Sequence, residues 1–224
     1  MAPQADAFDD IAAVIIEPYQ AAGGMASPCG EYWKWLRDYT RERGILIIFD
    51  EIQTGFGKTG SFFAYEETGI VPDILLAGKG MSNGFGLGAL LLSKAVGASI
   101  KPYKIAGGSA DNDLMRSIVN LVFDIFEKEK IVNHAREMGG LFVNLLKDAL
   151  SAHGIEGSFC GKGLFFSLEL PEGLALTLAV ELRNRGIRVG RMENMMIFRP
   201  PLVITEEDVR LVCGAVKTIL SEMK

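Results

Sequence analysis

Apolar residues along this chain form short unbroken runs that alternate with stretches of helical spacing. The runs at residues 11–16 and 45–49 have the length of a strand, and uninterrupted apolar runs of that length are typical of strands buried on both faces of a parallel sheet. Between them, residues 32–43 carry apolar side chains at helical spacing, and Gly44 provides a stop for the helix. The order strand, helix, strand predicts a βαβ unit.

The pattern changes character near the middle of the chain. Further strands are expected at residues 74–77 and 86–93, and residues 114–152 predict two helices or one bent helix. Short strands and helices then alternate as in α+β domains, with strands at 164–170, near Val189 and at 195–198, and helices at 174–185 and 205–223. We therefore predict an α/β fold, with part of a mostly parallel sheet in residues 1–140 and a small α+β domain in residues 141–224.

Composition narrows the class of protein. The 224 residues are 49% hydrophobic with a net charge of -5 and no long basic run, which argues against nucleic acid or an anionic membrane surface as a partner. No apolar run reaches the roughly 18 residues of a membrane span, and no secretion signal is expected. Cys29, Cys160 and Cys213 are far apart and odd in number, which favours a reducing cytoplasm over a disulfide frame. His134 and His153 lack ligand-like neighbours, so no metal centre is expected.

Charged residues follow two of the predicted strands. Asp50 and Glu51 come directly after residues 45–49, and Lys79 follows residues 74–77 in a glycine turn. Ligands of open α/β sheets bind at the carboxyl ends of strands, so these side chains could face one crevice. The alternatives are a solvated acidic turn and a surface lysine.

A lysine and an acid at such a site suggest a particular chemistry. Burial at a strand end would lower the pKa of Lys79, and a neutral amine can condense with a carbonyl group. Pyridoxal phosphate needs both groups, a lysine for its aldehyde and a carboxylate such as Asp50 to keep its pyridine nitrogen protonated.

Two longer motifs carry a resemblance to a known family. Residues 50–60 are D-E-I-Q-T-G-F-G-K-T-G and residues 72–80 are P-D-I-L-L-A-G-K-G, with A-A-V-I-I-E-P at 12–18 before them and R-P-P-L-V-I-T-E-E-D at 199–208 after them. This series resembles the signature of class III pyridoxal-phosphate aminotransferases, which have the fold type I architecture. The resemblance implies transamination and pyridoxal 5'-phosphate as the cofactor.

The resemblance also implies roles for individual residues. Lys79 would form the Schiff base with the cofactor and shuttle a proton, and Asp50 would pair with the pyridine nitrogen. Ile52 would pack against one ring face, because two residues beyond Asp50 an extended chain returns to the same side. Gln53 would bind the 3-oxygen of the ring. Ser109 looks like the counterpart of a residue that binds the phosphate across a subunit boundary.

Some features depart from the family pattern. Members are about twice as long, so the chain resembles only their C-terminal half, and we expect a truncated or split form that is weak or inactive alone. Ala22 stands where members acting on α-ketoglutarate carry a glutamate, which resembles the branch that uses pyruvate. Arg199 directly precedes Pro200, whereas the family's arginine lies three residues before the proline pair.

Three functions follow as alternatives. The first is transfer of an amino group from an amine or ω-amino acid to a keto acid, with pyruvate favoured. The second is another reaction of the same cofactor, such as decarboxylation. The third is a non-catalytic remnant that dimerises or binds a partner. A homodimer is expected, and a separate polypeptide could carry the missing N-terminal half.

Overall fold

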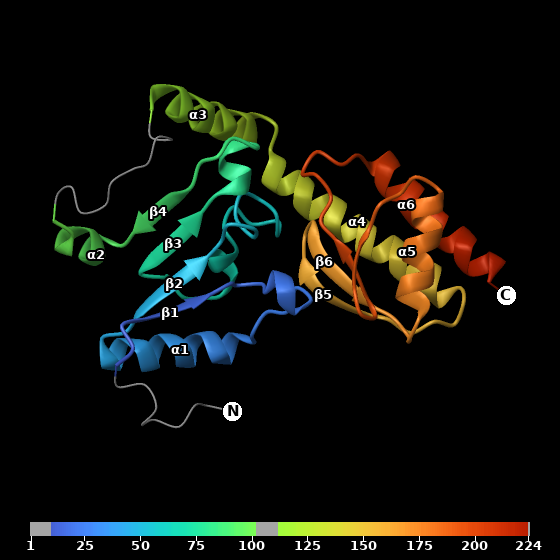
Figure 1. Cartoon of the computed structure of the whole chain (residues 1–224), viewed down its shortest axis with the longest axis horizontal. Coiled ribbons are helices and arrows are strands. Elements are labelled where there is room, and N and C mark those ends of the chain that lie inside the picture. The colour runs from blue at the N-terminus through green and yellow to red at the C-terminus, as the bar shows by residue number, and fades with distance from the viewer. Residues whose placement is uncertain (1–9, 102–111, 224) are drawn as a thin grey trace.

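The structure, a computed structural model, describes residues 10–101 and 112–223. Figure 1 shows two units side by side, each built on a four-stranded sheet, with α3 and α4 leading from the first unit to the second. Within the described residues, no helix is both long enough and apolar enough to cross a membrane.

The N-terminal unit contains a sheet, one covering helix and several short turns. In chain order its elements are β1 (Ala13–Ile16), the 3-10 turn Ala21–Gly23, α1 (Gly30–Arg43), β2 (Leu46–Asp50), the 3-10 turn Ala64–Glu67, β3 (Ile74–Ala77), the 3-10 turn Lys79–Ser82, β4 (Ala89–Leu92), α2 (Lys94–Ser99) and α3 (Asp113–Lys128).

The first sheet is mostly parallel, as predicted. Its order is β1-β2-β3-β4, in which β1, β2 and β3 run parallel and β4 pairs antiparallel with β3 at the edge. Ile47 and Phe49 of β2 have no exposed surface, and they pack on Trp33 and Leu36 of α1. The apolar run of β2 is therefore explained by its central place beneath a helix.

The C-terminal unit is an antiparallel sheet packed on three helices. Its elements are α4 (Ile131–Ser151), β5 (Ser158–Lys162), β6 (Phe165–Glu169), α5 (Leu174–Asn184), β7 (Gly190–Met192), β8 (Met195–Phe198) and α6 (Glu206–Glu222). The strand order is β5-β6-β8-β7, and the helices bury one continuous core against it, which includes Phe142, Phe166, Leu178 and Phe198. This confirms the α/β class with its mixed second part.

One strand of the second sheet was not predicted from the sequence. This strand is β5, which includes Gly161 and Lys162 and precedes the strand predicted at residues 164–170. The long helical region is two helices, which is one of the two arrangements predicted, and Lys130 takes a left-handed conformation between α3 and α4. The proposed domain boundary at residue 140 falls inside α4 and stays a prediction.

The two units meet along the loop that follows β2. The backbone N–H of Leu164 donates to the carbonyl of Lys58 at 3.0 Å, and the guanidinium of Arg136 donates twice to the carbonyl of Gly60. The loop after the first strand is also held, because the Ser167 hydroxyl donates to the carbonyl of Gly24 at 2.6 Å. Backbone carbonyls in the loops of the first unit thus accept hydrogen bonds from the second unit.

Candidate functional site

The ends of two adjacent parallel strands define the site. Strand β2 ends at Asp50, which lies opposite Leu76 of β3, and β3 ends at Ala77, two residues before Lys79. The segments that follow β2 and β3 therefore leave the sheet at the same edge. The structure brings the strand ends together as the sequence predicted, and the catalytic roles of Asp50 and Lys79 stay predictions.

Asp50 is half-buried and partly anchored. Its Oδ1 accepts a hydrogen bond from the backbone N–H of Ile52 at 3.0 Å, which fixes the carboxylate at the start of the loop. Within the described residues, no hydrogen bond is formed by the other carboxylate oxygen, so it can accept a proton donor from a ligand.

Lys79 begins a 3-10 turn with a left-handed backbone, at a φ of 42°. Its side chain is exposed, so the expectation of a buried lysine is wrong for this chain. The reason is that the chain leaves the sheet at Gly78, so Lys79 stands in the 3-10 turn that follows and not in the buried strand. A Cβ on Gly78 would lie 3.6 Å from the Ile52 side chain. Ile52 thus lies against the turn that carries Lys79.

The other predicted residues fall into two groups. Gln53 is half-buried, and its Oε1 accepts a hydrogen bond from Arg199 Nη1 at 3.2 Å, which links it to the C-terminal unit. Its amide N–H groups are still available as donors. Ser109 lies outside the described residues, so its assignment stays a prediction.

Glu51 is the first residue that the sequence reading missed. It has no exposed surface, so the solvated acidic turn is wrong at this position. Its carboxylate accepts hydrogen bonds from the backbone N–H groups of Ala64 and Tyr65, both at 2.7 Å, and from the Thr54 hydroxyl at 3.0 Å. Burial raises the pKa of Glu51, while these three hydrogen bonds act in the opposite direction. The available signal was the two-residue period of β2, because Glu51 continues the buried face of Phe49.

Lys58 is the second missed residue. Its ammonium donates a hydrogen bond to the carbonyl of Pro200, across the junction of the two units. Burial and, to a smaller extent, the charge of Arg199 together lower the pKa of Lys58 to about 8. No local sequence signal marks this burial, because it depends on a segment more than a hundred residues away.

The residues at the strand ends fit a pyridoxal ring in their chemistry. An exposed amine suits the aldehyde, the free oxygen of Asp50 suits the protonated ring nitrogen, and the donor groups of Gln53 suit a ring oxygen. Ile52 offers an apolar surface between the two strand ends.

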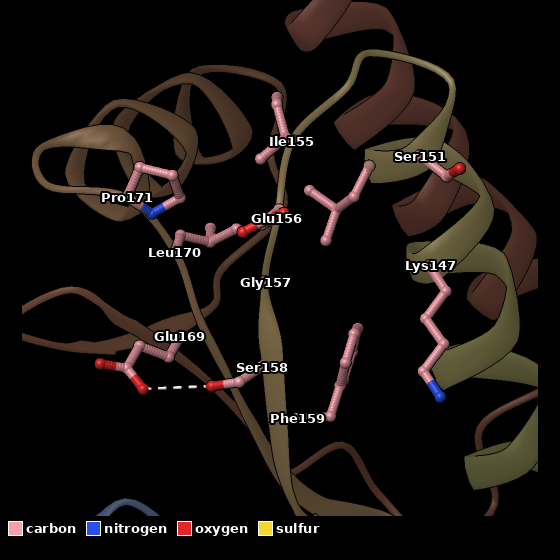
Figure 2. A pocket seen from close by; sticks show the side chains of 11 residues that line it. Lys147, Ser151, Ile155, Glu156, Gly157, Ser158, Phe159, Glu169, Leu170 and Pro171 are labelled. Carbon is pink, nitrogen blue, oxygen red and sulfur yellow. Dashed lines mark hydrogen bonds between the residues drawn. The ribbon is translucent and has the colours of Figure 1, made fainter.

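Of two cavities in the structure, the smaller lies beside the strand ends and the larger lies away from them. The cavity, of about 290 Å³, adjoins the turn of Lys79, since Gly80 and Asn83 line it together with apolar residues of α3. The larger hollow, of about 630 Å³, lies in the C-terminal unit and shares no residue with the strand ends. Figure 2 shows Lys147 and Phe159 on its walls. Because the 290 Å³ cavity adjoins the turn that carries Lys79, it is the better candidate for the functional site.

Comparisons with known proteins agree with the fold and the strand-end motifs. A family model described as aminotransferase class-III matches residues 3–220. Acetylornithine aminotransferase 1 of Bradyrhizobium diazoefficiens is 33% identical over 202 residues, which are 88% of this chain and 49% of that protein.

Solved structures extend the comparison. An ornithine aminotransferase from Toxoplasma gondii, with partial occupancy of pyridoxal phosphate at its active site, is 28% identical at a TM-score of 0.83, over 95% of this chain and 52% of that one. An S-selective transaminase from Arthrobacter sp. is 25% identical at a TM-score of 0.84, over 94% of this chain and 51% of that one. The chain spans about half the length of these relatives, and by its sequence match and its fold it belongs to the class III aminotransferases, enzymes that depend on pyridoxal phosphate.

Proposed function

We propose that this chain takes part in transamination, in which an amino group moves from an amine or ω-amino acid to a keto acid. The observation that carries the proposal is the placement of Asp50 and Lys79 at one edge of the sheet, after adjacent parallel strands, with Ile52 against the lysine turn. Pyridoxal phosphate, when bound, supplies an electron sink for the bonds at the substrate's reacting carbon.

Each residue of the strand ends has a role in this proposal. The amine of Lys79 would hold the cofactor through its aldehyde, with loss of water, and would carry a proton to and from the substrate carbon. Asp50 holds the proton on the ring nitrogen with its free carboxylate oxygen. Ile52 packs against the ring, and Gln53 donates to the ring oxygen while Arg199 holds its own oxygen.

The finer choice of substrates is also a proposal. Relatives named acetylornithine and ornithine aminotransferases support an ω-amino acid as the amino donor. Pyruvate is proposed as the favoured acceptor because Ala22 lies in the short turn after β1, where the family resemblance implies a glutamate in members that act on α-ketoglutarate. A direct test compares turnover with pyruvate and with α-ketoglutarate in the presence of one donor.

Partners and location complete the proposal. A homodimer is supported by apolar side chains of α3 that lie exposed, and the chain's length, about half that of its relatives, supports a requirement for further protein at the site. Charge-assisted hydrogen bonds to the cofactor's phosphate are roughly twice as strong as neutral hydrogen bonds. We therefore infer that the chain binds the cofactor weakly when no protein group makes such bonds to the phosphate. A reducing cytoplasm is supported by three free cysteines.

The test traps the cofactor on the protein, which detects even weak binding. The purified chain is incubated with pyridoxal phosphate, reduced with borohydride and mapped by mass spectrometry. We expect the adduct on Lys79, its loss in Lys79→Ala, and its persistence in Lys94→Ala, which removes an exposed lysine elsewhere in the same unit.

Activity then separates the alternatives. In any assembly that shows transamination, Lys79→Ala should lower turnover by about a hundredfold or more, because it removes the group that moves the proton. Adducts spread evenly over surface lysines would contradict the cofactor site. Release of carbon dioxide without amino transfer would instead support decarboxylation.

A further inference from the structure

One carboxylate joins three separate segments at the junction of the two units. Glu67 Oε2 accepts hydrogen bonds from the Tyr19 hydroxyl at 3.1 Å and from the Lys162 ammonium at 2.8 Å. Its Oε1 accepts a further hydrogen bond from the Ser61 hydroxyl. Tyr19 lies in the loop after β1, Ser61 lies in the loop after β2, and Lys162 is the last residue of β5. We call these four side chains the Glu67 cluster.

The turn that carries Glu67 is itself tied to the end of β2. Glu67 is the last residue of the 3-10 turn Ala64–Glu67, and the backbone N–H groups of Ala64 and Tyr65 in this turn donate to Glu51. Glu51 directly follows Asp50 of the candidate site. One short turn therefore connects the Glu67 cluster with the strand end.

The hydrogen bonds of the Glu67 cluster are of the strong, charge-assisted kind. The Glu67 side chain is only 21% exposed, and its carboxylate forms an ion pair with Lys162. Burial and the charge of Glu67 raise the pKa of Tyr19, so the hydroxyl keeps its proton and acts as the donor. Hydrogen bonds to an ionised carboxylate are roughly twice as strong as neutral ones, and the convergence of three of them distinguishes this cluster from an isolated exposed ion pair.

The segments that the cluster joins surround the candidate site. The loop after β1 leaves the sheet beside the end of β2, because β1 and β2 are parallel neighbours, and ligands of open α/β sheets bind at such ends. This loop also packs on the second sheet, where Met25 and Ile197 share one apolar cluster. Two residues after Ile197, Arg199 donates to Gln53 of the candidate site. Strands β5 and β8, which flank β6, thus both contact the strand-end loops.

We propose that Glu67 is a positioning residue for the candidate site, which holds the loop after β1 in place and seats the C-terminal unit on the strand ends. Its effect on turnover rests on the proposed transamination, whereas its hold on the loop does not. Release of the loop would weaken the binding of the keto acid more than it slows the chemical step, because Asp50 and Lys79 keep their places at the strand ends.

Hydrogen exchange followed by mass spectrometry tests the loop in the purified chain without any cofactor. The backbone N–H groups of Gln20 and Met25 donate hydrogen bonds within the loop, so their exchange reports its opening. Glu67→Ala and Tyr19→Phe should each raise exchange in residues 19–26 by about fivefold or more, because a hydrogen bond to a charged group is lost. Exchange in α6 should not change. Tyr32→Phe is the matched control, since Tyr32 is exposed and its hydroxyl forms no hydrogen bond within residues 10–101 and 112–223.

Lys162 offers a rescue by a conservative variant. Lys162→Met removes the cationic donor and should raise exchange in residues 19–26 by about threefold or more. Lys162→Arg keeps a cationic donor and should stay close to the wild type. If Glu67→Ala disturbs folding, Tyr19→Phe and the two Lys162 variants decide the case.

Kinetics then tests the effect on the site. In any assembly that shows transamination, Glu67→Ala should raise KM for the keto acid by about fivefold or more and change kcat by less than about twofold. Unchanged exchange in residues 19–26, an equal rise in α6, equal effects of Lys162→Met and Lys162→Arg, or a loss of kcat at constant KM would overturn the proposal. Because the exchange measurement needs no cofactor, its failure is distinct from a failure of the proposed function.

Discussion

Glu51 shows at the residue scale how the loop after β2 is held in place. Its carboxylate closes a ring of contacts between the end of β2 and the turn at Ala64 and Tyr65, thirteen and fourteen residues later. The sequence neighbours of Glu51, Asp50 and Ile52, both belong to the candidate site. Glu51 therefore supports the geometry of the strand end without facing the proposed ligand.

Replacement of Glu51 by glutamine tests this support. The amide keeps the size of the side chain, but its N–H₂ group faces one of the backbone N–H donors and leaves it unsatisfied. We expect a loss of about 1–3 kcal/mol in the free energy of unfolding, measured by urea denaturation. Glu31→Gln, on the exposed part of α1, should change stability by less than about 0.5 kcal/mol. An unchanged midpoint for Glu51→Gln would contradict a structural role.

Lys58 gives a pH-dependent prediction. Its pKa is lowered from 10.5 to about 8 in the folded chain, so the unfolded chain binds more protons between these values. Stability therefore rises with pH in this window, and the penalty of the buried charge is fully present below it. From about pH 7.5 to about pH 9 the Lys58 contribution should grow by about 1 kcal/mol.

The measurement compares the wild-type chain with Lys58→Met across this pH range. The difference in unfolding free energy, wild type minus variant, should increase with pH, because only the wild type titrates at this position. Lys147→Met removes an exposed lysine, so the difference in unfolding free energy between the wild type and this variant should not change with pH. A flat difference for Lys58→Met would show that Lys58 is not buried as a charged group.

At the element scale, helix α4 fixes the distance between the two units. Gly139 is buried at the point where α4 crosses the backbone of Gly163, and a Cβ there would lie 2.2 Å from the Gly163 carbonyl oxygen. Gly163 in turn touches the backbone of Thr59 in the loop after β2. A chain of close backbone contacts thus connects α4, the second sheet and the loop beside the candidate site.

Two adjacent glycines of α4 provide a matched pair of variants. Gly139→Ala should destabilise the chain by about 1–3 kcal/mol, because the new methyl group overlaps backbone atoms that cannot rotate away. Gly140→Ala meets nothing within 4 Å and should stabilise by about 0.5–1 kcal/mol through helix propensity. Thermal unfolding of both variants measures the difference. Equal midpoints would mean that α4 does not approach Gly163 so closely.

At the scale of the whole molecule, helix α3 has an apolar stripe without a described partner surface. The sequence indicates the stripe, and the structure leaves Leu114, Leu121 and Ile125 exposed, at 64%, 58% and 44%. Large exposed apolar patches mark sites of association. We therefore expect the chain to self-associate at micromolar concentration.

Sedimentation velocity measures this association directly. Leu121→Glu should shift the chain towards the monomer, because it places a charge in the middle of the stripe. Leu176→Glu, at a similarly exposed position on α5, should not. A wild-type chain that sediments as a monomer at these concentrations would contradict the expectation.

Much of the architecture follows from the sequence because local patterns record it. The apolar runs of β1, β2 and β3 predicted the parallel strands, and the motifs at residues 50–60 and 72–80 predicted that Asp50 and Lys79 follow adjacent strands. These features depend on the period and length of apolar segments, which neighbouring residues alone determine. Strand β5 escaped because its alternating, glycine-containing sequence has no unbroken apolar run.

The sequence by itself determined most of the elements, the family and which polar residues follow the strand ends. Only the tertiary structure decided which of those residues are buried, since Lys79, expected to be buried, is exposed, whereas Lys58 is half-buried. It also decided that Glu51 is enclosed. The physical reason is that burial and charge repulsion depend on which distant segment covers a side chain. The contact of Lys58 with Pro200 spans 142 residues, and no local pattern encodes it.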